Sequence, residues 1–470
     1  MKNRTISIFI ILFIITGNYA LSIGNLSPLA KMKESLHQRT NNIAFRQLKR
    51  YVYGRDKATS FVMMAEKSPM DRNKCGYASQ ARYYCPDSAQ TGYNILSEID
   101  SIFAFANNQL NYAIRCTQEA KQEYGDKSLV SPYSINENGS LKLVGPYDWC
   151  SGFFPGSLWQ MYSYTHDKYW YNEAVKYTCP LEKVKWYKST HDLGFMIYCS
   201  FGQAYRLTKA QSYKKVLIQA AKSLSSRYNP RVKAIRSWDW NRNVWQCPVI
   251  IDNMLNLELL FWASEVTGDS LYYNIAVNHA NTTLKNHFRS DYSSYHVVDY
   301  DTIVGNARFK GTHQGYSDAS VWSRGQAWGL YGFTMCYRFT KNPVYLNQAE
   351  RIADFIFGQP NLPTDLIPYW DMKDPDIPNA PRDASAAAVT ASALYELSGY
   401  AEPCKSVFYK RLADTIIKNL SEHYLASLGT NQGFLLLHST GNRPKNSQVD
   451  VPLSYADYYY LEALLRKAKL

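Results

Sequence analysis

Asp252 is a carboxylate that stands among apolar residues. It lies in the stretch Val249–Val266, which reads VIIDNMLNLELLFWASEV and carries apolar residues on nearly every side of a helix. A helix of that kind is buried all round, and an ionised carboxylate is rarely placed in dry surroundings without a partner or a task. Because acidic residues also favour the first turn of a helix, Asp252 is either a helix cap or a catalytic carboxylate.

Further polar motifs occupy similar positions, at or just before the starts of predicted apolar helices. They begin at Asp148 (DWCSGFFP), His191 (HDLGF), Trp322 (WSRGQAW), Arg382 (RDAS) and Ser454 (SYAD). If the apolar helices run parallel to one another, these starts gather at one mouth. Unpaired N–H groups and the positive ends of the helix dipoles then favour an anion at that mouth.

The helices that must position these motifs alternate in character along the chain. Apolar helices end in turns such as Tyr162–Thr165, Tyr205–Thr208 and Tyr337–Thr340, and a one-sided amphipathic helix follows each turn. The Thr, Ser, Asp and Asn residues at these turns are good N-caps. Buried and half-buried helices that alternate as hairpins form a ring of two layers.

Hydrophobic periodicity predicts about twelve helices, which make an all-α (α/α)6 barrel of six hairpins with parallel inner helices. The helices are expected near 96–122, 153–164, 167–187, 192–207, 210–227, 249–266, 269–287, 322–340, 343–358, 383–398, 403–424 and 453–468. Period-two alternation is scarce outside Ser294–Asp301, so we expect few strands.

Composition and charge indicate the kind of partner. The chain has 470 residues, enough for a large core, and contains 39 Tyr and 11 Trp. Aromatic faces at this density often build sugar-binding clefts. The formal net charge of +13 favours an anionic partner. Because the basic residues are dispersed and no DNA-reading motif is present, an acidic glycan fragment fits better than nucleic acid.

The amino-terminal sequence predicts export. Lys2 and Arg4 precede the apolar run Ile6–Ile15, which is too short to span a bilayer and is typical of a removed signal peptide. We therefore expect a signal peptide at 1–22, a periplasmic or secreted protein, and no integral membrane segment after signal removal. An N-terminal extension at 23–94 has no assigned role, and the (α/α)6 domain occupies 95–470.

The cysteines do not indicate a metal site. Nine Cys are present, an odd number, and their spacing matches no zinc pattern. Cys75 and Cys85 lie in a polar stretch where an oxidising compartment permits a disulfide loop. Cys199, Cys247 and Cys336 lie in apolar surroundings, which favours buried free thiols. We expect neither a metal nor an organic cofactor.

Several of these motifs together resemble glycoside hydrolase family 88, the unsaturated glucuronyl hydrolases, over about 95–470. The resembling stretches are DWCSGFFPGSLW, HDLGF, IDNMLNLELLFWA, SYHVVDYD, GTHQGY with SRGQAW, and RDASAA. Cys150 departs from the family, which commonly has a small hydroxyl residue there. The resemblance implies an (α/α)6 barrel without a cofactor. It also implies hydrolysis of the unsaturated uronic acid that polysaccharide lyases leave at a non-reducing end.

The resemblance also implies roles for individual residues. It places the general acid/base on Asp252 with Asp192 as its carboxylate partner, and two carboxylates that share a site push one pKa up. The implied substrate-binding residues are Trp149, His191, Trp238, His296, Gln314, Arg324 and Trp328. Each of these residues also has an interpretation without substrate. Each Trp could pack in the core, each His could have a structural role, and Arg324 could form a salt bridge to Asp or Glu. Asp383 we interpret as a helix cap.

Three other functions remain compatible with the residues. An unsaturated rhamnogalacturonyl or ulvan-fragment hydrolase would share the barrel and the chemistry, and it would differ in the sugar beyond the cleaved bond. A non-catalytic acidic-glycan-binding toroid would keep the aromatic residues without needing both Asp192 and Asp252. A hydrolase of saturated glycans is also compatible, because fold does not determine chemistry. The leading prediction is a hydrolase of lyase-generated chondroitin, hyaluronan or heparin disaccharides, of unknown oligomeric state.

Overall fold

The computed structural model describes residues 92–470, which belong to one compact unit, Ser88–Leu470. The predicted signal peptide at 1–22, the extension as far as residue 91 and the Cys75–Cys85 loop lie outside the described residues. No helix in 92–470 is both long and apolar enough to cross a membrane. Cys199, Cys247 and Cys336 are free and buried, which confirms that prediction.

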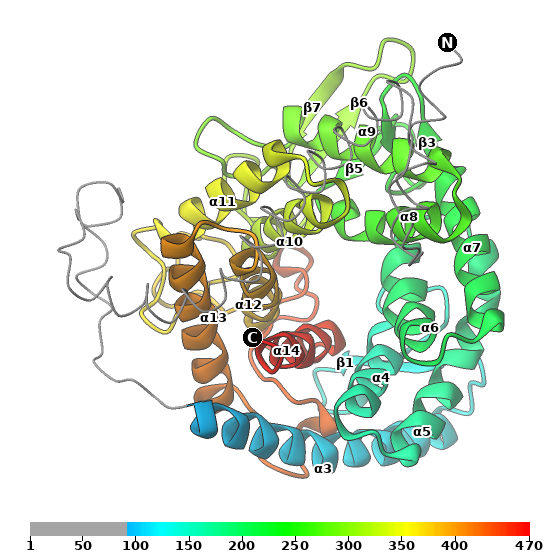
Figure 1. Cartoon of the computed structure of the whole chain (residues 1–470), viewed down its shortest axis with the longest axis vertical. Helices are drawn as coiled ribbons and strands as arrows, with labels where there is room; N and C mark the ends of the chain where they lie inside the picture. The colour runs from blue at the N-terminus through cyan, green and yellow to red at the C-terminus, as the bar shows by residue number, and fades with distance from the viewer. Residues whose placement is uncertain (1–91) are drawn as a thin grey trace, which may run out of the picture. The chain divides into compact units, whose positions relative to one another are not determined.

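Two concentric layers of helices form the described unit (Figure 1). The inner helices are α4 (Phe153–Thr165), η3 (Gly194–Gly202) continued by α6 (Gln203–Thr208), α8 (Asn253–Thr267), α10 (Ser323–Thr340), α12 (Ala384–Ser398) and α14 (Ser454–Lys467). The outer helices are α3 (Gly92–Tyr124), α5 (Lys168–Thr178) with the 3-10 turn η2 (Cys179–Trp186), α7 (Gln211–Ser225), α9 (Ser270–Asn286), α11 (Pro343–Phe357) and α13 (Pro403–His423). Each inner helix contacts the next, and α14 contacts α4, so the ring closes. The predicted (α/α)6 barrel is confirmed.

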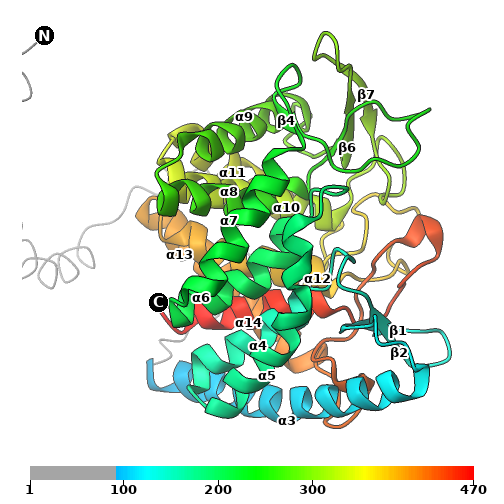
Figure 2. The same ribbon diagram turned by 90° about the vertical axis from the view of Figure 1, so that its right-hand side faces the viewer.

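Short antiparallel strands lie at the end of the ring where the inner helices begin (Figure 2). They are β1 (Ser131–Ile135) with β2 (Leu141–Val144), β3 (Tyr228–Asn229) with β4 (Ala234–Ile235), and a three-stranded sheet of β5 (Pro248–Ile250), β6 (Val297–Tyr300) and β7 (Ala307–Gly311). The strand predicted within Ser294–Asp301 is confirmed as β6.

The prediction of a helix from residue 249 is wrong at its start. Val249 and Ile250 form β5 and pair with Val298 and Val297 of β6. A short apolar run fits a buried strand as well as a buried helix, so periodicity alone does not separate the two. Asp252 therefore lies where a strand passes into a helix.

The turns between layers repeat one hydrogen-bond pattern. Inner helices end in Thr165, Thr267 and Thr340, whose hydroxyls accept bonds of 3.2 Å from the N–H groups of Asp167, Asp269 and Asn342. The Thr residues thus close the inner helices, while the Asp and Asn side chains cap the outer ones. The prediction of N-caps at these turns is confirmed for the Asp and Asn residues, which lie two positions after each Thr, and is wrong for Thr itself.

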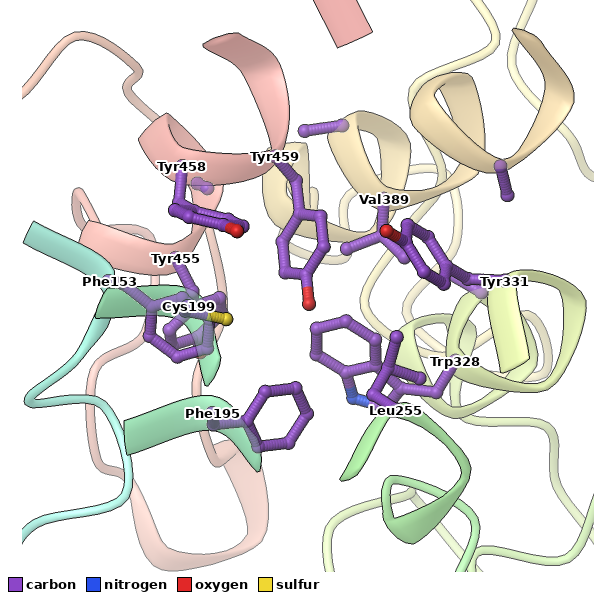
Figure 3. Packing of buried hydrophobic residues seen from close by; sticks show 14 of the residues in the cluster. Phe153, Phe195, Cys199, Leu255, Trp328, Tyr331, Val389, Tyr455, Tyr458 and Tyr459 are labelled. Atoms are coloured by element: carbon purple, nitrogen blue, oxygen red, sulfur yellow. The ribbon is translucent and has the colours of Figure 1, made fainter. Parts of the chain in front are cut away.

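Aromatic side chains fill the centre of the ring and form what we call the aromatic floor (Figure 3). Its members are Phe153, Phe195, Trp328, Tyr455 and Tyr459, all of them buried. Phe195 and Trp328 lie 5.4 Å apart between ring centroids, and Trp328 and Tyr459 lie 5.3 Å apart. Tilted and edge-on rings at these distances attract one another beyond the area that they bury. The floor separates the two ends of the barrel.

Close packing sets the position of η3 against α8. η3 is a π-helix, a form that is often found at functional sites. A Cβ atom on Gly194 would lie 2.6 Å from the Cα atom of Asn256, so only glycine permits this approach. The side-chain oxygen of Asn256 accepts a 3.0 Å hydrogen bond from the N–H of Phe195. This contact fixes the position of the segment that carries Asp192 relative to the segment that carries Asp252.

Substituting Gly194 by Ala should separate η3 from α8. The added methyl group meets backbone, which cannot rotate away, so we expect the free energy of unfolding to fall by about 1–3 kcal/mol. Denaturant unfolding measures this loss. Gly145→Ala is the matched control, because its Cβ would make only an ordinary 3.6 Å contact. Equal stability of the two variants would contradict this account of the η3–α8 contact.

Candidate active site

Asp252 does not cap its helix. It occupies the N-cap position of α8, but its backbone is in the right-handed helical region and its side chain makes no capping hydrogen bond. The carboxylate is buried, and its Oδ2 atom has no hydrogen-bond partner in the described part of the chain. A buried oxygen without a partner is costly, so the cap interpretation fails and a functional one gains support.

Burial changes the acidity of Asp252. Desolvation is the largest cause and raises the pKa of Asp252 to about 6, and the nearby Asp192 charge acts in the same direction. The charges of His191 and Arg324 oppose this rise. A carboxyl group with this pKa exchanges its proton near neutral pH, which is what a general acid/base requires.

His296 faces Asp252 with a defined tautomer. Its Nδ1 atom accepts hydrogen bonds from the backbone N–H groups of His313 (3.0 Å) and Gln314 (3.1 Å), so the ring proton is assigned to Nε2. Nε2 lies 3.6 Å from Oδ2 of Asp252, just beyond hydrogen-bond distance. Burial, followed by the charge of His313, lowers the pKa of His296 well below its usual value. The imidazole is therefore neutral and presents an N–H toward Asp252.

Asp192 lies in a more polar environment than Asp252. Its Oδ2 atom accepts a 2.5 Å hydrogen bond from the Thr190 hydroxyl, and its Oδ1 atom lies 3.1 Å from Nε2 of His191. The Ser237 hydroxyl accepts from the N–H of Ile250 (3.0 Å) and lies 3.2 Å from Nδ1 of His191. Ser237 therefore donates to Nδ1, and His191 donates from Nε2 to Asp192. Two carboxylates in unlike environments are suited to different roles.

Arg324 forms a salt bridge to an aspartate, which is the alternative to substrate binding that the sequence left open. The guanidinium is buried, and its Nη1 atom donates to Oδ2 of Asp383 at 2.7 Å and to the carbonyl of Thr440 at 2.5 Å. Nη2 donates to the carbonyl of Gly441 at 2.6 Å. Asp383 also accepts from the backbone N–H groups of Ser385 and the next residue, which confirms its predicted cap role. Of the guanidinium nitrogens, only Nε is without a partner among the described residues.

The remaining candidates lie at different depths. Trp149 is half-buried and packs on the aromatic floor, with its ring centroid 5.6 Å from that of Phe195. Trp328 is wholly buried in that floor, and its Nε1 atom has no hydrogen-bond partner in residues 92–470. Trp238 stacks on Trp240 with ring centroids 4.8 Å apart. The structure thus places Trp149 and Trp238 nearer the surface than Trp328.

The Gln314 side chain contacts the same loop as Arg324. Its Nε2 atom donates to the carbonyl of Gly441 at 3.2 Å, while its backbone N–H holds His296. Gln314 therefore links the β7–α10 connection to the loop before α14.

Sequence reasoning missed several residues of this site. Thr190 and Ser237 orient Asp192 and His191, and Trp322 packs on the ring of His296 with centroids 4.6 Å apart. Thr190 directly precedes the motif that begins at His191, and Trp322 is the first residue of the WSRGQAW motif, which are usable signals. Ser237 had no local signal, because its partner is distant in the sequence.

The arrangement supports proton transfer by side chains. Asp252 supplies a carboxyl group with a pKa of about 6, and Asp192 lies beside it as a hydrogen-bonded carboxylate. Within residues 92–470, no group of three or more His, Cys, Asp or Glu residues is placed to hold a metal ion. These residues suit general acid–base catalysis.

Two kinds of curated hydrolase are similar to this chain. An unsaturated glucuronyl hydrolase of Formosa agariphila is 48% identical over 383 residues, covering 76% of this chain and 95% of that protein. An unsaturated chondroitin disaccharide hydrolase of Streptococcus agalactiae is 34% identical over 341 residues, covering 71% of this chain and 85% of that protein. No model of a protein family matches the chain.

Solved structures agree with these relatives. A crystal structure of an unsaturated glucuronyl hydrolase specific for heparin has a TM-score of 0.74 and 46% identity, covering 79% of this chain and 97% of that one. The unsaturated glucuronyl hydrolase of Bacillus sp. GL1 has a TM-score of 0.70 and 32% identity, covering 77% and 96%. With a shared fold and near-complete coverage of its relatives, the chain belongs to the unsaturated glucuronyl hydrolases, the enzymes of glycoside hydrolase family 88.

Proposed function

We propose that the enzyme removes the 4,5-unsaturated glucuronic acid from the non-reducing end of glycosaminoglycan fragments made by polysaccharide lyases. The buried carboxyl group of Asp252, beside a second carboxylate and without a hydrogen-bond partner on Oδ2, is the observation that carries this proposal. The formal charge of +13 suits an anionic substrate. Relatives named for heparin and for chondroitin disaccharides support the substrate class.

The proposed chemistry is hydration of a vinyl ether. Protonated Asp252 gives its proton to C4 of the unsaturated ring, and positive charge develops at C5 and the ring oxygen. Water then adds to C5 while the Asp252 carboxylate takes up a proton, which regenerates the acid. The resulting hemiketal collapses and releases a keto-uronate and the shortened saccharide. Asp192 acts as the partner carboxylate, and its negative charge favours the developing positive charge.

The candidate binding residues have proposed roles that fit their positions. The N–H of His296 points at the space beside Asp252, where it orients the carboxyl group or an attacking water. His191 holds Asp192. Trp149 and Trp238 offer ring faces to the sugar, while the free nitrogens of Arg324 and Trp328 are buried donors at the base of the site.

Lyase digests test the proposed substrate directly. Chondroitin, hyaluronan, heparin, ulvan and pectin are each digested with the matching lyase, and loss of the ultraviolet absorbance of the unsaturated uronate is followed. We expect loss with glycosaminoglycan digests. Loss only with the ulvan or pectin digest would favour the rhamnogalacturonyl or ulvan-fragment class, and no loss with any digest would refute the proposal.

We also propose that the protein is exported to the periplasm or secreted. The basic start followed by the apolar run Ile6–Ile15 supports this location. Amino-terminal sequencing of the mature protein tests it, with a start near residue 23 expected. A mature protein that retains Lys2 and Arg4 would contradict export by a cleaved signal.

Asp252→Asn should give a folded and nearly inactive enzyme. Loss of general acid–base catalysis lowers the rate by about 10²–10⁴, and the neutral amide avoids burial of a charge, so the melting temperature should not fall. Asp192→Asn should also lower kcat severely. Turnover of an unsaturated disaccharide and thermal unfolding measure both effects, with exposed Asp126→Asn as the control. If Asp252→Asn kept most of its turnover, Asp252 would lose its role; if Asp192→Asn changed only KM, the carboxylate pair would be wrong.

The pH profile should report the acid form of Asp252. Since burial raises the pKa of Asp252 to about 6, the proton needed for the first step is present below that pH and is lost above it. We expect kcat/KM to fall by about tenfold per pH unit on the alkaline side of the profile. A profile of kcat/KM against pH measures this limb. Activity that stays level to pH 8 would contradict a proton donor with this pKa.

Arg324→Lys should lower stability more than substrate affinity. One ammonium group cannot replace the fork that holds Asp383 and two carbonyls, so we expect the free energy of unfolding to fall by about 1–3 kcal/mol. Denaturant unfolding and KM are measured together. Arg242→Lys is the control, because its pair with Asp239 is exposed and should contribute little. Unchanged stability with a large rise in KM would instead make Arg324 a substrate contact.

A further inference from the structure

A cavity lies between the inner helices of the barrel, on the side of the aromatic floor away from the helix starts. It has a volume of about 250 Å³, and we call it the rear cavity. Phe195 and Tyr459 of the floor line it, together with Arg206 of α6 and Arg466 of α14. Figure 2 places the carboxyl terminus, which follows α14, opposite the strands that surround the candidate active site. The rear cavity is therefore a separate site.

Most of the charged groups around the rear cavity satisfy one another. Arg338 lies 2.7 Å from Glu258 and 2.8 Å from Glu396. Arg466 lies 2.8 Å from Glu396 and 3.6 Å from Glu462. These five side chains form an alternating chain in which each carboxylate contacts at least one guanidinium. The glutamates are thus compensated and do not make the cavity anionic.

Two further cations at the rear cavity have no acidic partner. Arg206 and Lys469 both line it and are exposed to solvent. Arg206 contacts the side-chain oxygen of Gln203, and in the described part of the chain neither cation forms an ion pair. The pKa of Lys469 is lowered, first by burial and then by the charges of Arg206 and Arg466. Arg206 and Lys469 therefore add positive charge to the lining of the rear cavity that no carboxylate offsets, which favours an anion there.

The wall of the rear cavity is aromatic as well as cationic. Tyr198, Tyr331 and Tyr458 line it together with the two floor residues, and Ser163 and Gln203 add uncharged polar groups. Ligand sites combine such apolar and aromatic walls with a few polar groups that fix orientation. A ring with hydroxyl groups fits these walls, and a carboxylate fits the cations. The volume suits a ligand of about one sugar ring.

We propose that the rear cavity binds a small organic anion of the sugar-acid class, with its carboxylate held by Arg206 and Lys469 and its ring against the tyrosines. This inference does not depend on the proposed function, because it concerns the end of the barrel away from Asp252.

Binding of D-glucuronate to the whole protein tests the proposal. Calorimetric titration is carried out on the wild type, on the double variant Arg206→Ala/Lys469→Ala and on Lys222→Ala, which removes an exposed charge from α7 as a control. Gln314→Ala serves as the variant at the other end of the barrel. We expect the double variant to weaken one binding event by at least about tenfold, since two charged contacts are lost. The control and Gln314→Ala should retain that event, and D-glucose should bind far more weakly than D-glucuronate.

Several outcomes would overturn the proposal. These are no binding of D-glucuronate to the wild type, unchanged binding to the double variant, or loss of all binding in Gln314→Ala, which would place the sugar acid at the candidate active site. Equal binding of D-glucose would refute the role of the cations. Thermal unfolding of each variant shows that a lost signal reflects binding rather than loss of fold.

Discussion

The chemistry proposed for this enzyme depends on the burial of one carboxyl group at the junction of β5 and α8. The Oδ2 atom of Asp252 is buried without a hydrogen-bond partner in the described part of the chain, and that isolation raises its pKa to about 6. A carboxylate near water or a fixed donor would be a weaker proton source at neutral pH. The apolar character of α8 on nearly every side therefore serves both the acidity of Asp252 and the packing of the barrel.

Distant segments converge to maintain this environment. Pairing of β5 with β6 brings His296 beside Asp252, and the N–H of Ile251 donates to the His296 carbonyl at 3.0 Å. The Gly194–Asn256 contact sets Asp192 against the same helix. Arg324 links the start of α12 to the loop before α14, because it donates to Asp383, the N-cap of α12, and to two carbonyls of that loop. Each contact joins motifs that are far apart in the sequence.

The barrel could be predicted because local sequence patterns indicate each helical hairpin. These patterns are the hydrophobic periodicity of the helices and the turns after Thr165 and Thr340. The start of α8 could not, because Val249 and Ile250 suit a buried strand equally well. The motifs and the family resemblance predicted the residues of the site, but they did not predict the hydrogen-bond partners of those residues. The tautomer of His296 depends on N–H groups of a separate loop, and Ser237 reaches His191 only through folding. Tertiary hydrogen bonds of this kind leave no local pattern.

The central claim is that burial raises the pKa of Asp252 to about 6, and a direct titration tests it. The carboxyl carbons of aspartate are labelled with carbon-13, and NMR spectra are recorded from acidic to neutral pH. The Asp252 signal is assigned by its absence from the Asp252→Asn spectrum. The account predicts a titration midpoint of about 6. A midpoint near 4, the ordinary value for aspartate, would contradict it.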